Sequence, residues 1–336
     1  MRFRRKMNNE KLMIYKQIAQ AIRDARSILI ASHEDPDGDS LGSQLAISRV
    51  MRKLEKSPII VNQGRIPFKY QFLPDIADIT DIKNFGGDDN FDLVMILECP
   101  DAERTGAVKN LIHNGVKIIN IDHHHDSRPF GAINYLDDKA SSVGEMLFEL
   151  FAAENLPIDR ETAILLYAAI LTDTGRFRYN STTKRTMEVA GRLIDMGVNP
   201  REITDKIYFA LPQSTLRLTG EVLSGITFHE NGRICLLRLD KKMIDNHKTD
   251  ISEMDGLADY TLAAKDVIVG GLLKEINGGF TKVSLRSRDK IDVSHVAHKY
   301  GGGGHINAAG FGVNKPIDSI INKLLDDLKE LVHGSV

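Results

Sequence analysis

Four short segments of this 336-residue sequence contain several side chains that can bind divalent metal ions. The segments are HEDPDGDSLGS (33–43), ILECPDAERTG (96–106), NIDHHHD (120–126) and LTDTG (171–175). Their candidate ligands are carboxylates and imidazoles: His33, Asp37, Asp39, Glu98, Asp122, His123, His124 and Asp173. A ligand set without thiolates suits Mn²⁺ or Mg²⁺ better than a structural zinc site. The pattern predicts a metal-dependent hydrolase.

Three of the four segments follow apolar runs that we expect to be buried strands. The runs are SILIAS (27–32), FDLVMIL (91–97) and VKIINI (116–121), and PIIVN (58–62) is a further short strand. Helix-prone sequence between them predicts βαβ units and a parallel sheet. Loops that leave the carboxyl ends of parallel strands meet in one crevice, so we expect these segments to form one site.

Each segment also has a simpler structural explanation. Asp39 can cap the helix that follows it, and the Asp, Pro and Gly residues around it are common in turns. The three histidines can lie on a surface loop, and Asp173 can belong to a helix that ends at the glycine two residues later. Asp122 can orient a histidine ring instead of binding metal, and Asp101 is an alternative ligand in the second segment. We assign His125 to solvent.

The candidate ligands are numerous enough for two metal ions. The first two segments supply three carboxylates and one histidine, and His123 and Asp173 add further ligands. Two ions ~3.5–4 Å apart that share a bridging carboxylate and a hydroxide are suited to the hydrolysis of phosphate esters. The residues therefore predict a site for two Mn²⁺ or Mg²⁺ ions.

The second half of the chain has a different pattern. Apolar residues have helical spacing over 141–208, and the pattern changes near 213–222. Two predicted hairpins follow, ITFHENGRICLLRLD (226–240) and DVIVGGLLKEINGGFTKVSLRSR (266–288), with turns at Glu230-Asn231-Gly232 and Asn277-Gly278. A glycine run and an amphipathic helix over 317–332 come last. We expect two domains, 1–215 and 216–336, the second a smaller α/β domain with a mixed sheet.

The glycine run GGGGHINAAG (301–310) is a candidate anion-binding loop, although flexible loops and structural turns have similar sequences. Consecutive glycine N–H groups can surround a phosphate, and an arginine can hold it through two hydrogen bonds. His305 follows the glycines, and Arg286 and Arg288 precede them. We favour anion binding over a structural turn.

The composition excludes several classes of protein. The formal net charge is −2 and the chain has no Trp, which argues against binding long nucleic-acid strands through basic grooves and stacking aromatic residues. Cys99 and Cys235 form no CxxC pair, and the basic start MRFRRKMNNE lacks the apolar segment of a secretory signal. The longest apolar run, AILLYAAIL (163–171), is too short to cross a bilayer. We expect a cytoplasmic protein that does not bind a membrane.

The motifs DPDGDSLGS, DHH, TDTG and GGGGH, in this order, resemble those of the DHH phosphoesterase superfamily. The combination is similar to the nanoRNase and pAp phosphatase (NrnA-type) branch over nearly the whole chain. The resemblance implies an N-terminal Rossmann-like DHH domain with helices on both faces of its sheet. It also implies a DHH-associated C-terminal domain that binds substrate.

The resemblance further implies roles for individual residues. The first ion is held by His33, Asp37 and Glu98, and the second by Asp39, Glu98, His123 and Asp173. His124, with Asp122 beside it, faces the scissile phosphate as an electrostatic stabiliser or proton donor. The nucleotide and phosphate of the substrate are bound by Arg286, Gly303, Gly304 and His305.

Glu98 departs from the family pattern, which usually has aspartate at this position. Arg104-Thr105-Gly106 matches the family's Arg-x-Gly and fixes the register, so Glu98 is the equivalent residue and Asp101 a poorer substitute. A glutamate can bridge two ions, but its additional methylene group changes their spacing or requires a backbone adjustment.

The resemblance implies a Mn²⁺-dependent hydrolase of phosphate ester bonds. The expected reactions are exonucleolytic removal of 5′-mononucleotides from very short RNA (nanoRNA) and dephosphorylation of pAp to AMP. The same residues fit a phosphodiesterase for pApA or cyclic dinucleotides, and Glu98 keeps open a nucleotide-binding regulator with weak catalysis. A RecJ-like exonuclease and an inorganic pyrophosphatase fit the domain content less well. Short RNA and small nucleotides are the expected partners, and a homodimer remains open.

Overall fold

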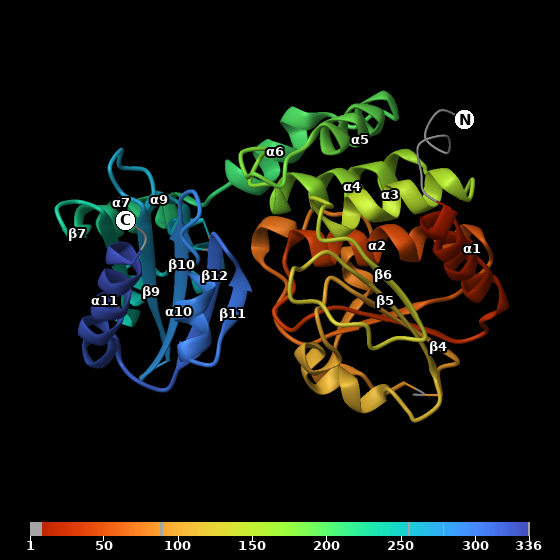
Figure 1. The fold of residues 1–336 in the computed structure, drawn as a ribbon, viewed down its shortest axis with the longest axis horizontal. Helices are drawn as coiled ribbons and strands as arrows, with labels where there is room; N and C mark the ends of the chain where they lie inside the picture. The colour runs from red at the N-terminus through yellow and green to blue at the C-terminus, as the bar shows by residue number, and fades with distance from the viewer. Residues whose placement is uncertain (1–8, 88–89, 255, 278, 335–336) are drawn as a thin grey trace. The chain divides into compact units, whose positions relative to one another are not determined.

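A six-stranded parallel sheet forms the centre of the first unit in the computed structural model (Figure 1). The structure describes residues 9–87, 90–254, 256–277 and 279–334, and it divides into two compact units, Met1–Phe209 and Ala210–Val336. The strand order is β3-β2-β1-β4-β5-β6. The strands are β1 (Ile28–Ala31), β2 (Ile59–Asn62), β3 (Ile79–Asp81), β4 (Leu93–Leu97), β5 (Lys117–Asp122) and β6 (Ile133–Leu136). The predicted parallel α/β fold is confirmed.

Helices cover both faces of this sheet, which is why its central strands are apolar along their whole length. Ile28 and Ile30 of β1 belong to the larger core, which the α-helices complete, whereas Leu29 and Ala31 belong to a second core on the opposite face. The α-helices are α1 (Asn9–Asp24), α2 (Gly38–Lys53), α3 (Val143–Ala153), α4 (Arg160–Asp173), α5 (Lys184–Asp195) and α6 (Pro200–Tyr208). Short 3₁₀ helices are η2 (Phe68–Tyr70), η3 (Ile76–Asp78), η4 (Ile82–Asn84) and η5 (Ala102–Leu111), of which η4 and η5 contribute to the second core.

Two glycines allow α2, α3 and α4 to approach one another closely. A Cβ atom on Gly42 of α2 would lie 2.6 Å from the backbone oxygen of Leu165 in α4. A Cβ atom on Gly144 of α3 would lie 2.6 Å from the Ala169 Cβ atom, also in α4. Neither position accommodates a side chain, so α4 is held directly against both helices.

The second unit contains a mixed sheet of six strands in the order β11-β12-β10-β9-β8-β7. Of the strand pairs that the structure describes in this sheet, only β8–β9 is parallel. The strands are β7 (Thr227–His229), β8 (Ile234–Leu239), β9 (Val269–Asn277), β10 (Phe280–Ser287), β11 (Gly303–His305) and β12 (Ala308–Val313). Its helices are α7 (Gln213–Ser224), α8 (Lys241–His247), η6 (Ile251–Met254), α9 (Leu257–Tyr260), α10 (Ser294–Lys299) and α11 (Ile317–His333). One apolar core includes α10 and α11, and another includes α7, α8 and α9.

Both predicted hairpins are present as antiparallel pairs, β7–β8 and β9–β10. Gly278 of the second predicted turn lies outside the described residues. The expected domain limits, 1–215 and 216–336, fall within α7 and stay a prediction. No helix in the described ranges has the length and apolar character needed to cross a membrane.

Candidate metal centre

The predicted ligands lie at the point where the strand order of the first sheet reverses, between β1 and β4. β1 ends at Ala31 and is followed by the loop that contains His33, whereas Glu98 and His123 directly follow β4 and β5. In open α/β sheets, ligands bind outside the carboxyl ends of the strands at such a point. The topology thus explains why residues from distant segments form one cluster.

Asp39, in the first turn of α2, is completely buried and held by the start of α3. The Val143 N–H donates to Asp39 Oδ2 at 2.6 Å, and the Gly144 N–H donates to Oδ1 at 2.9 Å. The Ser43 hydroxyl also donates to Oδ1, at 2.9 Å. Burial raises the pKa of Asp39, and positive charge on His123 opposes this shift. The N-terminus of α3 therefore fixes both carboxylate oxygens and favours the charged form.

His123 lies at the centre of three carboxylates. Its Nδ1–H donates to the Ala140 carbonyl at 3.1 Å, which leaves Nε2 for other partners. Nε2 is 3.2 Å from Asp173 Oδ2, 3.3 Å from Glu98 Oε1 and 4.0 Å from Asp39 Oδ2. Burial alone would lower the pKa of His123, but the carboxylates outweigh burial and raise the pKa well above its usual value. The surroundings of Nε2 thus favour a positive charge.

Glu98 is the strand-end carboxylate of this cluster. Its side chain is buried, and its backbone has a left-handed conformation with φ of 54°. Burial raises its carboxyl pKa well above the ordinary value. Among the described residues, Oε2 of Glu98 is buried without a hydrogen-bond partner, although buried oxygens are normally paired. Glu98, His123 and His124 each offer a ligand atom within 4.8 Å of the others, so these residues fit a divalent cation.

Asp101, the alternative to Glu98, has a local structural contact. Its Oδ1 accepts the Arg104 backbone N–H at 3.1 Å and caps η5. Glu98, in contrast, has a carboxylate oxygen next to both His123 and His124, with Oε1 lying 3.6 Å from His124 Nδ1. This geometry supports Glu98 as the residue equivalent to the family's aspartate.

His33 and Asp37 extend the cluster on the side of β1. The His33 Nδ1–H donates to the Glu34 carbonyl at 2.8 Å, so Nε2 can accept a bond from the Ser40 hydroxyl 2.9 Å away or bind a metal. Asp37 Oδ1 lies 4.0 Å from His33 Nε2 and also caps α2. Burial raises the pKa of Asp173 to about 7, and negative charge on Asp39 and Asp37 adds to this increase. The two halves of the cluster are therefore close enough to interact electrostatically.

His124 and Asp122 form a hydrogen-bonded pair beside the cluster. The His124 Nδ1–H donates to Asp122 Oδ1 at 2.8 Å, and the Ser127 hydroxyl donates to the other Asp122 oxygen. Burial lowers the pKa of His124, but Glu98 and Asp122 raise it more, to about 9. Glu98 and Asp122 thus favour the protonated form of the His124 ring. His125, which we assigned to solvent, is exposed.

The predicted substrate-binding residues of the second unit lie on β10 and β11, the two strands that flank β12. Arg286 of β10 pairs with Ala308 of β12, which in turn pairs with His305 of β11. Residues in register on adjacent strands point to the same face, so Arg286 and His305 share one face of the sheet. Arg286 Nε lies 3.3 Å from Asp259 Oδ1 within the same unit.

Part of the glycine run has a structural reason that the sequence did not reveal. Gly303 and Gly304 belong to β11, which pairs with β12. Gly304 has φ of 136°, and a Cβ atom there would lie 2.5 Å from the Ala308 backbone oxygen. Close pairing of two strands therefore requires glycine at 304, whatever it binds.

Sequence reasoning missed the backbone donors of Val143 and Gly144. A helix start was recognisable, because Ser142 caps α3 through the Glu145 N–H at 3.0 Å and Ser-x-x-Glu is a common capping pattern. That this helix start would meet Asp39, more than one hundred residues earlier, is a property of the tertiary fold.

Comparison with known proteins matches both units. Residues 27–170 match the model of the DHH family, N-terminal domain, and residues 232–334 match the DHHA1 domain. The bifunctional oligoribonuclease and PAP phosphatase NrnA of Thermus thermophilus is 30% identical over 322 residues, which cover 96% of this chain and 94% of the relative. The protein of the same name from Bacillus subtilis is 26% identical over 308 residues, or 91% of this chain and 94% of that one.

Solved structures show the same architecture. An exopolyphosphatase-related protein from Bacteroides fragilis has a TM-score of 0.88 at 25% identity, covering 96% of this chain and 98% of its own. RecJ from Thermus thermophilus, solved in complex with Mn²⁺, has a TM-score of 0.53 at 15% identity and covers 95% of this chain and 54% of its own, which shows the fold alone. With both family domains and the relatives spanning nearly its whole length, this chain belongs to the DHH family of phosphoesterases.

Proposed function

We propose that this chain is a metal-dependent hydrolase that degrades very short RNA to 5′-mononucleotides and dephosphorylates pAp to AMP. The observation that carries the proposal is the cluster of carboxylates around His123, in which the Oε2 atom of Glu98 is buried and unpaired. Relatives similar over most of the chain are named oligoribonuclease and PAP phosphatase, which supports the substrate class.

Two ions, Mn²⁺ or Mg²⁺, fit this donor set. We assign His33, Asp37 and Glu98 to one ion and Asp39, Glu98, His123 and Asp173 to the other. When bound, such ions lower the pKa of a water molecule to generate the nucleophile and neutralise charge on the phosphoryl oxygens. The α3 N-terminus keeps the Asp39 oxygens oriented, and the Ala140 carbonyl keeps the His123 ring in one tautomer.

His124 is proposed to act on the scissile phosphate. The hydrogen bond from Nδ1 to Asp122 favours the protonated ring, which can stabilise negative charge or donate a proton to the leaving oxygen. Asp122, completely buried and bonded to His124 Nδ1, is the positioning residue for this ring.

In the second unit, Arg286, Gly303, Gly304 and His305 are proposed to bind the nucleotide and phosphate of the substrate. Arg286 and His305 share one face of the sheet, and an arginine can bind a phosphate through two hydrogen bonds. Loss of such a charge-assisted contact affects substrate capture and leaves the metal ligands in place.

A substrate panel with metal-stripped protein tests the function. Turnover of pAp, pApA, RNA dimers to decamers, cyclic di-AMP and pyrophosphate is measured after addition of Mn²⁺ or Mg²⁺. We expect pAp and the shortest RNAs to be the best substrates. Faster turnover of cyclic di-AMP or pyrophosphate would contradict the proposed substrate class.

Variants of the cluster test the metal assignment in the same assay. The double variant Asp39→Asn with Asp173→Asn should lose turnover by orders of magnitude, and wild-type activity in it would exclude the two-ion site. Glu98→Asp should retain substantial activity, whereas Glu98→Gln should be nearly inactive because a neutral amide is a poor bridging ligand. If Asp101→Asn is more damaging than Glu98→Gln, the bridging residue is Asp101.

A further inference from the structure

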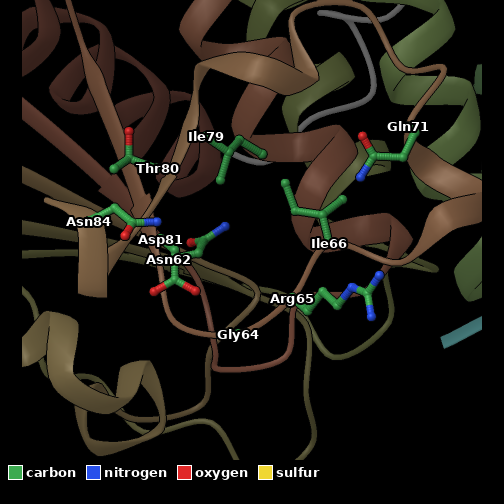
Figure 2. A pocket seen from close by; sticks show the side chains of 9 residues that line it. All are labelled: Asn62, Gly64, Arg65, Ile66, Gln71, Ile79, Thr80, Asp81 and Asn84. Carbon is green, nitrogen blue, oxygen red and sulfur yellow. The ribbon is translucent and has the colours of Figure 1, made fainter. Parts of the chain in front are cut away.

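A pocket of about 300 Å³ lies in the first unit at the carboxyl ends of β2 and β3 (Figure 2). None of the predicted metal or catalytic residues lines it. Polar, charged and apolar side chains all contribute to the lining, which consists of Asn62, Gly64, Arg65, Ile66, Gln71, Ile79, Thr80, Asp81 and Asn84. This volume is at the lower end of small-molecule sites and suits one ring system better than an oligonucleotide.

The pocket is directly connected to the loop that carries the predicted ligands His33 and Asp37. β2 is the neighbour of β1, and Asn62 at the end of β2 accepts the Ser32 backbone N–H at 3.3 Å. The next residue, Gln63, accepts the Asp35 N–H through its carbonyl at 2.9 Å. A molecule bound at the metal centre therefore has a neighbouring pocket along the same edge of the sheet.

The polar groups of the pocket are held in place by other parts of the unit. The Asn62 amide exchanges two hydrogen bonds with Gln44, at 2.9 and 2.8 Å. Asp81 ends β3, and its Oδ1 accepts the Lys83 N–H at 2.8 Å. The pocket is thus largely formed in advance, so little conformational entropy is lost when a ligand binds.

The chemistry of the lining indicates what would bind. Ile66 and Ile79 provide apolar surface against which a flat ring can pack, and Asn84 offers hydrogen-bonding groups near Asp81. A carboxylate accepts hydrogen bonds but donates none, so Asp81 selects N–H groups and repels phosphate. Figure 2 shows the Arg65 side chain extending away from Asp81 and Asn84, which places its positive charge at the other end of the pocket.

We infer that this pocket is a nucleobase subsite of the first unit, which binds a base with an exocyclic amino group through Asp81. Adenine, cytosine and guanine have such a group, whereas uracil offers only its ring N3–H, which lies between two carbonyl oxygens that a carboxylate repels. The ring packs against Ile66 and Ile79, and Arg65 lies toward the sugar–phosphate. The inference rests on the proposed function, because it assigns the base to the nucleotide adjoining the scissile bond.

Calorimetric binding of AMP, CMP, GMP and UMP to the full chain with Mn²⁺ tests the subsite without catalysis. The wild type should bind the three amino-bearing nucleotides more tightly than UMP. Asp81→Asn should weaken these three by roughly tenfold or more and change UMP little, because a charge-assisted hydrogen bond is lost. The asparagine side chain introduced by Asp81→Asn can still accept the Lys83 N–H. The second variant, Asn84→Ala, changes an exposed residue of the pocket and should also weaken binding.

The matched control is Asp78→Asn, which makes the same chemical change just outside the pocket. Asp78 is exposed and forms an ion pair with Arg52 at 2.6 Å, so its replacement should leave nucleotide binding unchanged. Equal effects of Asp78→Asn and Asp81→Asn, or no effect of either pocket variant, would overturn the inference.

Kinetics separate the subsite from the proposed function. In Asp81→Asn, KM for an adenine dinucleotide should rise about tenfold with little change in kcat, while turnover of a nitrophenyl phosphoester that lacks a base should be unchanged. An equal loss on both substrates would show that Asp81 supports the fold or the metal centre instead. If the wild type cleaves neither RNA nor pAp, the proposed function fails, and the calorimetric comparison still decides whether the pocket binds bases.

Discussion

Replacement of Glu98 by glutamine is expected to weaken Mn²⁺ binding without destabilising the metal-free protein. Glu98 is only 1% exposed, and burial raises its carboxyl pKa. A buried carboxylate without a cation costs free energy, so a neutral amide of similar size should be tolerated or preferred in the chelated protein. His123 and His124 offset only part of this cost, because the pKa of Glu98 stays raised beside them, and a bound metal ion would compensate the charge further.

The magnitude follows from the linkage between ligand binding and unfolding. At a Mn²⁺ concentration one hundred times Kd, binding raises the free energy of unfolding by about 2.7 kcal/mol. For a unit of the length of Met1–Phe209, this corresponds to a Tm increase of roughly 5–11 °C. If Glu98→Gln binds Mn²⁺ about a hundredfold more weakly, the gain at the same concentration is about 0.4 kcal/mol, or roughly 1–2 °C.

Thermal unfolding of the full chain by circular dichroism, in EDTA and in Mn²⁺, measures both quantities. Asp101→Asn is the matched control, because Asp101 lies in the same loop but caps η5. We expect this control to show the full Tm increase. A Glu98→Gln variant that loses stability in EDTA and still gains the full increase from Mn²⁺ would refute the assignment of Glu98 as a ligand.

Three further outcomes are expected. Asp39→Asn should lower the free energy of unfolding in EDTA by about 1–3 kcal/mol, because an amide NH₂ would face the N–H donors of α3; an unchanged urea midpoint would contradict this. Asp122→Asn should reduce kcat at least tenfold and keep the Mn²⁺-dependent Tm increase. The control His125→Asn, at an exposed position, should change neither quantity. Similar kcat values for the two variants would exclude Asp122 as the residue that positions His124. Arg286→Ala should raise KM for pAp by about ten- to hundredfold. The control Arg238→Ala removes an exposed ion pair and should leave KM unchanged. Equal KM values for the two variants would show that Arg286 does not bind substrate.

The sequence was sufficient to predict the central strands of the first unit but not its edge strands. β1 and β4 are apolar and buried throughout, β5 is buried over its last four residues, and their pattern is clear without tertiary information. β3 (ITD) and β6 (INYL) are short and partly polar, because each pairs with a neighbour on one side only. Such strands are defined by pairing rather than by their own composition. The 3₁₀ helix η5 was missed for a related reason, since it has almost no helical amphipathicity.

The candidate site shows a similar division. His33, Glu98 and His123 were recognisable because each follows a predicted strand, and parallel topology brings strand ends together. The backbone donors that hold Asp39 could not be recognised from the sequence, because they depend on packing between α2 and α3. The same holds for the pocket near Asp81, which is lined by short irregular segments after β2 and β3. Residue type and spacing thus predicted which candidate ligands lie together, whereas the groups that orient them required the fold.

The close packing of α4 against α2 and α3 has a consequence for how the length of this protein can vary. Asp173 is the last residue of α4, and the contacts of Gly42 and Gly144 hold the helix at Leu165 and Ala169. One inserted or deleted residue between Ala169 and Asp173 would rotate the carboxylate by about 100° around the helix axis and move it by about 1.5 Å along it. Insertions and deletions should therefore be tolerated before α4 begins or beyond its end, but not between Leu165 and Asp173.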